Sequence, residues 1–552
     1  MRKLLLIALL SLSYVGFAQT EGEITTSKIT DSLKTDSIDK LLKPDTTFIW
    51  YQADYEEDGY AGISLNQTYD FAKEKNLKSK EIIVAIIDSG IDTSHVDLKD
   101  NLWVNPREIP YNGIDDDGNG YIDDIHGWNF LGNQNGYCIE GETLELTRLY
   151  RKYKKKYKDK TKKDIKPEDK EEYEEWLGIK SHFHLKRLIY KGMYKSIKNA
   201  LKYYDKCEKM LANYFDDPNF TREQVESLEP RSESLADAKE FYLRWDNRQE
   251  LEDMFETYDS YANKKYNVLY NPRKKVGDDP LDINDSIYGN NILYVGKSSS
   301  HGTGVSGIVG AVRDNNVGID GIAPNVKLMI IRVVPGGDER DKDVALGIRY
   351  AVNNGARIIN CSFGKNFSPQ KEFVDEAVRY ARDHNVLIIH AAGNDSRNID
   401  KGHNYPTKKL DNPEEVATNW IEVGASGKHP DDSLIAEFSN YGMLVDIFAP
   451  GVDIYSTALK SKYRSSSGTS DASPVVCGVA ALVLSYYPDL TAEELKSIIL
   501  ESGTYYGDLK VLKPEEYKKR KKKKFKKLCS NPRVVNAHSA LRMAYERQNS
   551  GN

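Results

Sequence analysis

Short apolar runs that end in small or polar residues recur along this chain of 552 residues and constrain its fold more than any other feature. Five of them are predicted as buried strands: EIIVAIIDSGID (81–92), VKLMIIRVV (326–334), ARIINCSFG (356–364), NVLIIHAAGN (385–394) and NWIEVGAS (419–426). Strands that are apolar on both faces are typical of parallel sheets covered by helices on both sides. Amphipathic helical patterns at 342–355 and 371–385 lie between some of them. We therefore expect an α/β fold with a parallel, doubly wound sheet.

A helix near the carboxyl terminus has clear end signals. In TAEELKSIILESG (491–503), Thr491 and Glu494 have the spacing of a capping box. Gly503 is expected to stop the helix.

One block of the chain does not follow the strand and helix alternation. Between residues 140 and 275, apolar side chains recur every three or four positions, which places them on one face of a helix. They are Leu185, Ile189, Met193, Ile197, Leu201 and Tyr204. We predict a large α-helical insertion over 139–285, between two parts of one domain at 49–138 and 286–545. It is either a solvated excursion or a lid or docking arm, and the spacing does not decide between them.

The first residues are typical of an export signal. A short apolar stretch follows two basic residues, and Ala18 lies where a signal peptidase would cut, so we expect residues 1–18 to be removed. The stretch is short for a membrane anchor, which needs about 20 residues. Residues 19–48 are polar and are predicted to form a flexible leader. We therefore expect the protein in the periplasm or outside the cell.

Composition narrows the function classes. The 78 Lys and Arg residues nearly balance the 84 Asp and Glu residues, so net charge does not favour nucleic-acid binding.

Of the five cysteines, Cys361 and Cys477 lie in apolar runs and are expected to be buried thiols. Cys138, Cys207 and Cys529 lie in polar surroundings, where export would allow one disulfide that the sequence does not specify. The spacing fits no cysteine metal site.

Four polar residues interrupt the apolar runs where the chain turns. Asp88 and Asn394 end predicted strands, whereas His301 and Ser470 open predicted helices. Ligand sites of open α/β sheets form outside the carboxyl ends of the strands, so residues from such places can converge. A serine nucleophile needs a base, a histidine base needs a carboxylate to orient it, and a developing oxyanion needs hydrogen-bond donors. These four residues together supply all of these groups.

The sequences around the four residues are more specific than the residues themselves. IIDSGID, HGTGVSGIVGA, AAGN and SSGTSDASPVVCGVAALV occur in this order along the chain. Here the chain resembles the subtilisin-like serine proteases (subtilases), whose triad follows the order Asp, His, Ser. The resemblance covers about 50–138 and 290–545. It implies a subtilisin-like fold and an exported serine endopeptidase.

The resemblance also implies a role for each residue. Asp88 would orient His301, which would act as general base and then as general acid. Ser470 would form an acyl-enzyme, and its backbone N–H would form the oxyanion hole together with the side-chain amide of Asn394. The residues that resemble the pocket for the side chain before the scissile bond are Ser362, Phe363, Gly364, Ala392 and Gly393.

Asp471 departs from the family pattern, which usually has an apolar residue, often Met, at this position. A carboxylate in the first turn of a helix is favourable for the helix dipole. It would either raise the pKa of a nearby imidazolium or point to solvent, and no triad position is lost. A second departure is the leader, because 19–48 is too short and polar for the folded pro-domain that many subtilases carry.

The acidic loop NGIDDDGNGYIDDIHGW (112–128) is predicted to bind structural Ca²⁺. Its oxygen-bearing residues alternate before Gly120, as at the start of an EF-hand loop, although the closing Glu of such a loop is missing. The candidate ligands are Asp115, Asp117, Asn119, Tyr121 through its carbonyl, and Asp123 or Asp124. A turn cluster of Asn, Asp and Gly without a metal is the other interpretation.

The basic run KKRKKKKFKK (518–527) leaves two interpretations open. It is either a solvated loop or a patch that adheres to an anionic envelope or to nucleic acid.

For the whole chain we expect protein or peptide substrates, no nucleic-acid partner and a monomer. Two other functions stay open: a binding protein that kept the fold without turnover, which the intact triad disfavours, and an envelope adhesin built on the insertion and the basic run.

Overall fold

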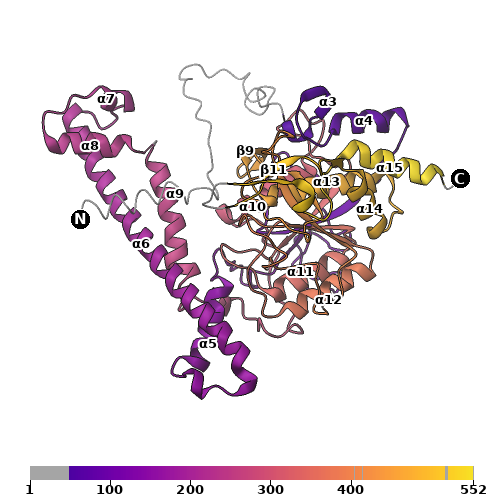
Figure 1. The fold of residues 1–552 in the computed structure, drawn as a ribbon, viewed down its shortest axis with the longest axis horizontal. Helices are drawn as coiled ribbons and strands as arrows, with labels where there is room; N and C mark the ends of the chain where they lie inside the picture. Colours follow the sequence, from indigo (N-terminus) through magenta and orange to yellow (C-terminus); the bar gives the residue numbers. More distant parts are fainter. Residues whose placement is uncertain (1–48, 246, 403, 413, 516–519, 551–552) are drawn as a thin grey trace. The chain divides into compact units, whose positions relative to one another are not determined.

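The computed structural model describes residues 49–245, 247–402, 404–412, 414–515 and 520–550. The predicted signal (1–18) and leader (19–48) lie outside these residues. The described chain forms two compact units (Figure 1). The first takes in the chain up to Glu140, then Lys274–Pro335 and Glu339–Asn552, and the second takes in Gly141–Arg273 and Gly336–Asp338. The domain bounds predicted from the sequence stay a prediction.

A sheet of nine strands, counted over the described residues, forms the centre of the first unit. In space the strands follow the order β10-β13-β7-β6-β5-β4-β1-β3-β2, and only β10 and β13 pair antiparallel. The strands are β1 (Ile82–Asp88), β2 (Gly127–Asn129), β3 (Val326–Arg332), β4 (Ile358–Cys361), β5 (Leu387–Ala391), β6 (Trp420–Ser426), β7 (Ile447–Pro450), β10 (Thr504–Tyr505) and β13 (Arg533–Val534). The parallel α/β fold expected from the five apolar runs is confirmed.

Alternate residues of the central strands face opposite sides of the sheet. In β1, Val84 and Ile86 belong to one buried cluster, whereas Ala85 and Ile87 belong to another. The first cluster includes residues of α4 (Leu65–Glu74), α10 (Ser300–Gly310), α13 (Thr469–Tyr486), α14 (Ala492–Ser502) and α15 (Ala537–Ser550). The second includes residues of α11 (Asp341–Asn353) and α12 (Lys371–Asp383). Helices therefore cover both faces, as in a doubly wound sheet.

The helix α13 lies in the core of the first unit. Among the described residues it is the one helix long and apolar enough to cross a membrane, but 89% of its length is buried inside the protein. Its small residues allow close packing, since a Cβ atom at Gly478 would lie 2.6 Å from the Cβ of Ile322. The amino end of this core helix is the segment that carries Ser470.

The helix α14 begins as the sequence predicts. The Thr491 hydroxyl accepts a hydrogen bond from the N–H of Glu494, and the Glu494 carboxylate accepts one from the N–H of Thr491. The helix ends before Gly503, as expected, but this glycine does not have the left-handed conformation of a helix cap. Gly503 has φ −58°, and a Cβ atom there would lie 2.8 Å from the carbonyl oxygen of Val534. This glycine therefore permits close packing against β13.

Smaller elements complete the first unit. They are the hairpins β8 (Ile454–Ala458) with β9 (Lys462–Ser466) and β11 (Lys510–Leu512) with β12 (Lys522–Lys524), the short helix α3 (Tyr55–Asp58), and the 3₁₀ turns η2 (Trp50–Gln52), η3 (Lys99–Asn101), η8 (Gly296–Ser299) and η9 (Phe525–Lys527). The 3₁₀ turn η7 (Pro272–Lys275) begins in the second unit and ends in the first. All five cysteines are free. Cys207 and Cys529 are buried, not in the polar surroundings that the sequence suggested.

The second unit is helical. Its elements are α5 (Glu145–Tyr157), η4 (Lys162–Asp164), η5 (Pro167–Asp169), α6 (Lys170–Phe215), α7 (Arg222–Ser227), α8 (Glu233–Leu243), α9 (Arg248–Asp259) and the π-helical turn η6 (Ser260–Lys265). The predicted apolar face of α6 is buried at Ile197 and Tyr204, but Leu185 is 58% exposed. Aromatic side chains take its place in the first half of α6, where Phe183 stacks on Tyr150 with ring centroids 3.9 Å apart.

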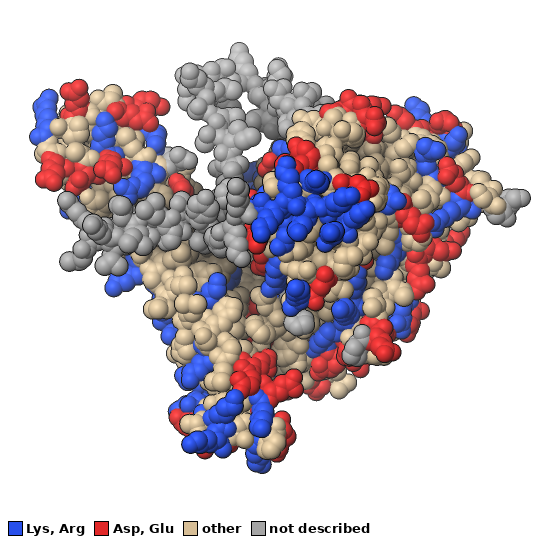
Figure 2. Space-filling view, in the orientation of Figure 1, with Lys and Arg blue, Asp and Glu red and all other residues tan. Residues whose placement is uncertain are grey.

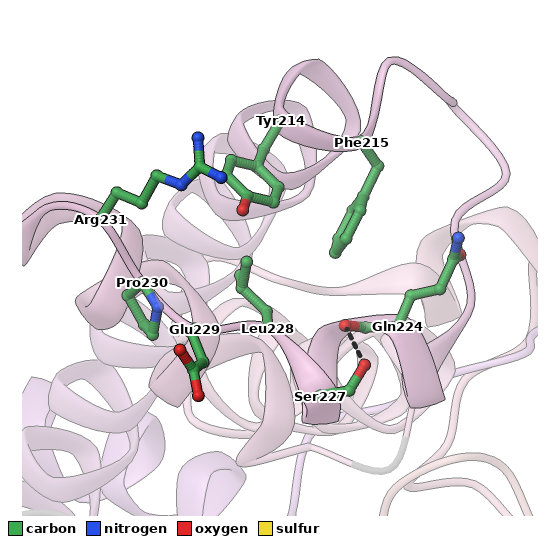
Figure 3. A pocket seen from close by; sticks show the side chains of 8 residues that line it. All are labelled: Tyr214, Phe215, Gln224, Ser227, Leu228, Glu229, Pro230 and Arg231. Atoms are coloured by element: carbon green, nitrogen blue, oxygen red, sulfur yellow. Dashed lines mark hydrogen bonds between the residues drawn. The ribbon is translucent and has the colours of Figure 1, made fainter.

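A pocket of about 470 Å³ is lined by the end of α6, by α7 and by the segment that follows α7 (Figure 3). Its walls are Tyr214, Phe215, Gln224, Ser227, Leu228, Glu229, Pro230 and Arg231. It lies in the second unit, whereas every residue for which the sequence predicts a catalytic role lies in the first. The pocket therefore does not coincide with the predicted active site.

Candidate active site

Asp88 and His301 form a hydrogen-bonded pair. Asp88 is the last residue of β1, and His301 lies in the first turn of α10. The Nδ1 atom of His301 lies 2.8 Å from Oδ1 and 3.0 Å from Oδ2 of Asp88. With an Nδ1–H that donates to the carboxylate, Nε2 is the nitrogen left to accept a proton. The arrangement has the geometry of an oriented general base.

Glycines allow α10 to approach the end of β1. Gly90 has φ +97°, a conformation that residues with a Cβ atom rarely adopt. A Cβ atom at Gly302 would lie 2.2 Å from the carbonyl oxygen of Gly90. The N–H of Gly302 instead donates to the Ser89 hydroxyl at 3.2 Å. The glycine after His301 is thus required for the helix to reach Asp88.

The electrostatic surroundings favour a protonated His301. The Asp88 side chain is 1% exposed and the His301 side chain 38% exposed. Burial acts to lower the pKa of His301, but the charge and hydrogen bond of Asp88, helped by the charge of Asp471, outweigh burial and the charge of Arg464. The pKa of His301 is therefore raised above its ordinary value of 6.5. An imidazolium that forms during a reaction would be stabilised here.

The side chain of Asn394 is fixed in one orientation. Its Oδ1 atom accepts hydrogen bonds from the backbone N–H of Thr469 at 2.9 Å and from the Thr469 hydroxyl at 2.8 Å. Because these two donors hold Oδ1, the Nδ2 group at the other end of the amide is held in place as well. A Cβ atom at Gly468 would lie 3.4 Å from this Nδ2 and 3.5 Å from the backbone nitrogen of Ser470. Both nitrogen atoms therefore lie near Gly468, at the start of α13.

Ser470 lies beside these donors and is partly exposed. Its carbonyl oxygen accepts a hydrogen bond from the Ser362 hydroxyl at 2.9 Å, which ties the start of α13 to the end of β4. Among the described residues, there is no hydrogen bond between the Ser470 hydroxyl and His301. The structure thus pairs Asp88 with His301 and Asn394 with the turn that carries Ser470, while the contact between nucleophile and base stays a prediction.

The predicted pocket residues follow the ends of β4 and β5. Ser362 and Ala392 are buried, so their side chains are not open to a ligand. Gly364 and Gly393 flank a residue that the sequence analysis missed: Cβ atoms at these positions would lie 2.6 Å and 3.2 Å from Oδ1 of Asn404. Asn404 also donates from Nδ2 to the carbonyl oxygen of Ala391 at 3.0 Å. Phe363 is 9% exposed.

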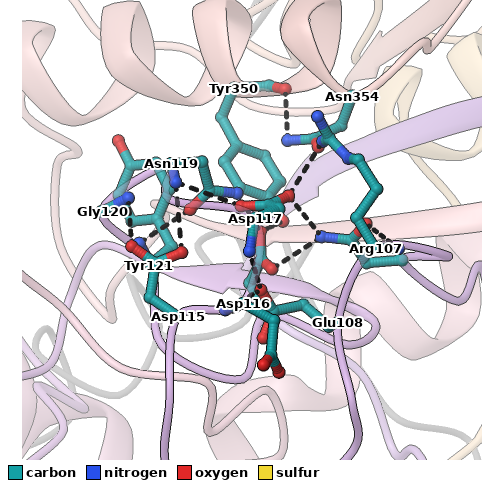
Figure 4. A network of polar contacts seen from close by, with 12 residues as sticks. Arg107, Glu108, Asp115, Asp116, Asp117, Asn119, Gly120, Tyr121, Tyr350 and Asn354 are labelled. Carbon is teal, nitrogen blue, oxygen red and sulfur yellow. Dashed lines mark hydrogen bonds and ion pairs between the residues drawn. The ribbon is translucent and has the colours of Figure 1, made fainter.

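The acidic loop brings three carboxylates together (Figure 4). One oxygen each from Glu108, Asp115 and Asp117 lie within 4.8 Å of one another. Glu108 precedes the predicted loop, so the EF-hand spacing could not reveal it. Its Oε1 atom accepts backbone N–H groups of Asp116 and Asp117, but Oε2 is buried without a hydrogen-bond partner. Such an orphaned oxygen fits a site for a cation that prefers oxygen ligands.

The other candidate ligands lie around this cluster. The Oδ1 atom of Asn119 accepts the N–H of Tyr121 at 2.7 Å. Asp123 accepts the backbone N–H groups of residues 112 and 113. Asp124 accepts a hydrogen bond from the Tyr350 hydroxyl at 2.5 Å, and burial raises its pKa to about 6. Within the described residues, the structure does not bring Asp123 or Asp124 into the group of three carboxylates.

Comparison with known proteins agrees with the fold. The subtilase family profile matches residues 79–517, so the chain belongs to the subtilase family. It is 36% identical to the thermostable alkaline protease of Halalkalibacterium halodurans over 211 residues, 38% of this chain and 54% of that protein. It is also 36% identical to subtilisin DY of Bacillus licheniformis over 219 residues, 39% of this chain and 74% of that protein. The chain thus spans about half the length of the first relative.

Proposed function

We propose that the protein is a serine endopeptidase that hydrolyses peptide bonds through an acyl-enzyme. The observation that supports this best is the hydrogen bond from His301 to Asp88, because it orients the imidazole with Nε2 available for proton transfer. Membership of the subtilase family and similarity to proteins named as proteases support the same activity. Proteins or peptides are the substrates.

Each step uses a group of this chain. Nε2 of His301 takes the proton from the Ser470 hydroxyl while the oxygen attacks the peptide carbonyl. Asp88 stabilises the imidazolium, which then gives its proton to the leaving nitrogen as the C–N bond breaks. The acyl group is now an ester on Ser470. Water attacks the ester, His301 takes a proton from the water, and the carboxylic product leaves as the proton returns to Ser470.

The oxyanion is proposed to bind at the start of α13. The proposed donors are Nδ2 of Asn394 and the backbone N–H of Ser470, whose nitrogen atoms both lie near Gly468. The two hydrogen bonds from Thr469 fix the amide before substrate binds, so no reorganisation is needed as the charge develops. The side chain before the scissile bond is proposed to lie against Phe363, Gly364 and Gly393, with Ser362 and Ala392 as buried supports.

A peptide-library digest tests the proposal. The wild-type protein should cleave peptides, and Ser470→Ala and Asp88→Asn should reduce kcat by about 10⁴-fold or more. Asp92→Asn is a matched control, because Asp92 is also a buried acid just beyond β1 but binds Ser94 and the backbone of Lys460 instead of His301. A folded wild-type protein that binds peptides without cleaving them would instead establish the binding-protein alternative.

We further propose that Glu108, Asp115 and Asp117 hold a structural Ca²⁺ ion. Arg107 forms an ion pair with Asp117 at 3.0 Å and offsets part of their mutual repulsion, but the orphaned oxygen of Glu108 favours a cation. When bound, the ion would neutralise the cluster and link the loop to the segment before it. The backbone carbonyl of Tyr121 and the side chain of Asn119 belong to the same loop and stay candidate ligands.

Thermal unfolding with and without chelator tests the calcium proposal. Chelation should lower the melting temperature of the wild-type protein, and Glu108→Gln should reduce that calcium-dependent shift. Glu140→Gln, a change at an acid outside the cluster, should leave the shift intact. A wild-type melting temperature that is the same in calcium and in chelator would exclude the site.

Export and envelope contact complete the proposal. Residues 1–18 are proposed to direct export, and sequencing the amino terminus of the mature protein would show whether the cut follows Ala18.

Figure 2 shows Lys and Arg side chains gathered where Figure 1 places the β11 hairpin. In this part of the chain Lys521, Lys523 and Lys527 are exposed, so we propose contact with an anionic envelope surface. Loss of binding to anionic vesicles after substitution of these three lysines by Gln would support this contact. We also expect the protein to have a monomeric mass in solution.

A further inference from the structure

The first part of the apolar stripe predicted for α6 is not used in packing. Leu185 is 58% exposed, Ile189 is 41% exposed, and Leu188 beside them is 73% exposed. Residues three and four apart are neighbours on a helix surface, so these three side chains form one aliphatic patch. Single exposed leucines need no explanation, but a contiguous apolar patch on the surface indicates a contact site.

Another side of α6 carries the packing of the second unit. Among the described elements, α5, α8, α9 and η6 contact this helix (Figure 1). The buried residues of α6 are Tyr173, Trp176, Ile179, Phe183, Ile197, Tyr204, Cys207 and Leu211. The aliphatic patch contributes none of them, so a polar substitution in it should leave the core of the unit intact.

A row of lysines continues from the aliphatic patch along the same side of α6. It begins three residues after Leu188, and each later lysine follows the one before by three or four residues. The lysine row is Lys191, Lys195, Lys198, Lys202, Lys206 and Lys209, and all six are exposed. The two acids in this stretch, Asp205 and Glu208, form ion pairs with Arg248. In the part of the chain that the structure describes, no ion pair neutralises the lysine row.

An aliphatic patch beside a lysine row fits the surface of an anionic lipid bilayer. Helices that lie on membranes bury aliphatic side chains among the acyl chains, while lysines attract the anionic headgroups. Each lysine near such a surface contributes about fivefold in affinity. Three side chains are too few for a stable protein interface, which buries about 1,000 Å² or more. A nucleic acid would use the lysines but not the leucines.

We propose that the aliphatic patch and the lysine row together, here called the α6 face, dock on an anionic lipid surface. The helical insertion then has the function of a docking arm, one of the interpretations that the sequence left open. The inference does not depend on proteolysis, because no residue of the α6 face belongs to the proposed active site.

Co-sedimentation of the mature protein with lipid vesicles tests the proposal. Anionic vesicles contain phosphatidylglycerol and phosphatidylcholine, and neutral vesicles contain phosphatidylcholine alone. Every protein compared carries Lys521→Gln, Lys523→Gln and Lys527→Gln, so that the contact proposed for the β11 hairpin does not contribute. This reference protein should bind the anionic vesicles at least about tenfold more strongly than the neutral ones, and salt should weaken the binding.

Substitution of the leucines tests the role of the lipid. Leu185→Ser combined with Leu188→Ser should lower the affinity for anionic vesicles by at least about tenfold, because two side chains no longer enter the acyl region. Leu269→Ser is the matched control, since Leu269 is 88% exposed in the same unit but lies outside α6. It should change the affinity by less than about threefold.

Substitution of the lysines tests the role of charge. Lys191→Gln combined with Lys195→Gln should lower the affinity for anionic vesicles by about fivefold for each lysine, or roughly 25-fold together. Lys155→Gln combined with Lys163→Gln removes the same charge from exposed positions of α5 and η4 and should have a much smaller effect. Peptide cleavage should be the same in all of these variants.

The outcomes decide the inference separately from the proposed function. No preference of the reference protein for anionic vesicles would overturn it. A leucine variant that binds like the reference protein, beside a lysine variant that does not bind, would show adsorption by charge alone and overturn the lipid assignment. If the double leucine variant does not fold, Leu188→Ser alone decides in the same way. Absence of peptide cleavage would overturn the endopeptidase and leave the docking result unaffected.

Discussion

Replacing Asn394 by Ala tests the proposed oxyanion hole. The proposed donors are Nδ2 of Asn394 and the backbone N–H of Ser470, whose nitrogen atoms both lie near Gly468, and the substitution removes one of the two donors. Removing the corresponding donor from subtilisin, a member of the same family, lowers kcat by about 10²–10³-fold, or about 2.7–4 kcal/mol. Because the bond matters most when charge develops on the oxygen, kcat should fall by this amount while KM changes little.

Thr469→Val is the matched control for this substitution. It removes the hydroxyl that donates to Oδ1 of Asn394 but keeps the backbone N–H bond and the Nδ2 donor. The same hydroxyl also accepts the backbone N–H of Gly393 at 3.0 Å, so two neutral hydrogen bonds are lost, each contributing about 0.5–1.5 kcal/mol. Because only one of them orients the Asn394 amide, kcat should fall by less than about tenfold. Both variants are assayed with one peptide ester after active-site titration, and their melting temperatures are compared. A kcat within threefold of wild type for Asn394→Ala, or a loss confined to KM, would refute the reasoning.

Three further predictions concern pH, packing and capping. Because the pKa of His301 is raised, kcat/KM should fall as the pH drops through a midpoint above 6.5, and a midpoint below 6 would contradict the electrostatic account. Gly302→Ala should lower kcat by at least about 100-fold or prevent folding. The reason is that the new Cβ atom would clash with the Gly90 carbonyl oxygen and displace α10. A fully active and stable variant would show that the helix can shift freely. Thr491→Ala should lower the free energy of unfolding by about 1 kcal/mol in urea titration without changing kcat, and unaltered stability would mean that the capping box contributes nothing.

Much of the fold is predictable because its signals are local. The runs that become β1 and β3 are apolar on both faces, which only a strand covered on both sides tolerates. The capping box of α14 is likewise contained in four neighbouring residues. The exposed Leu185 on α6 shows the limit of periodicity, because the pattern does not say which of two faces tertiary packing will bury.

The parts of the site that the sequence did not reveal depend on distant contacts. Asn404 lies between two glycines that follow different strands, and no spacing rule connects it to them. Glu108 joins the acidic cluster from outside the EF-hand pattern. The direction of Asp471 is set by Ser466, whose hydroxyl holds the carboxylate from the neighbouring hairpin. Each of these follows from tertiary structure and not from residue type.

The central claim is that Ser470 becomes a nucleophile because His301 and Asp88 activate it. The most direct measurement is mass spectrometry of the folded wild-type protein after treatment with a fluorophosphonate, with the adduct assigned by peptide mapping. We expect one adduct, on Ser470, that is absent in Ser470→Ala and forms far more slowly in His301→Ala. No adduct, or an adduct on another residue that is insensitive to the His301 substitution, would contradict it.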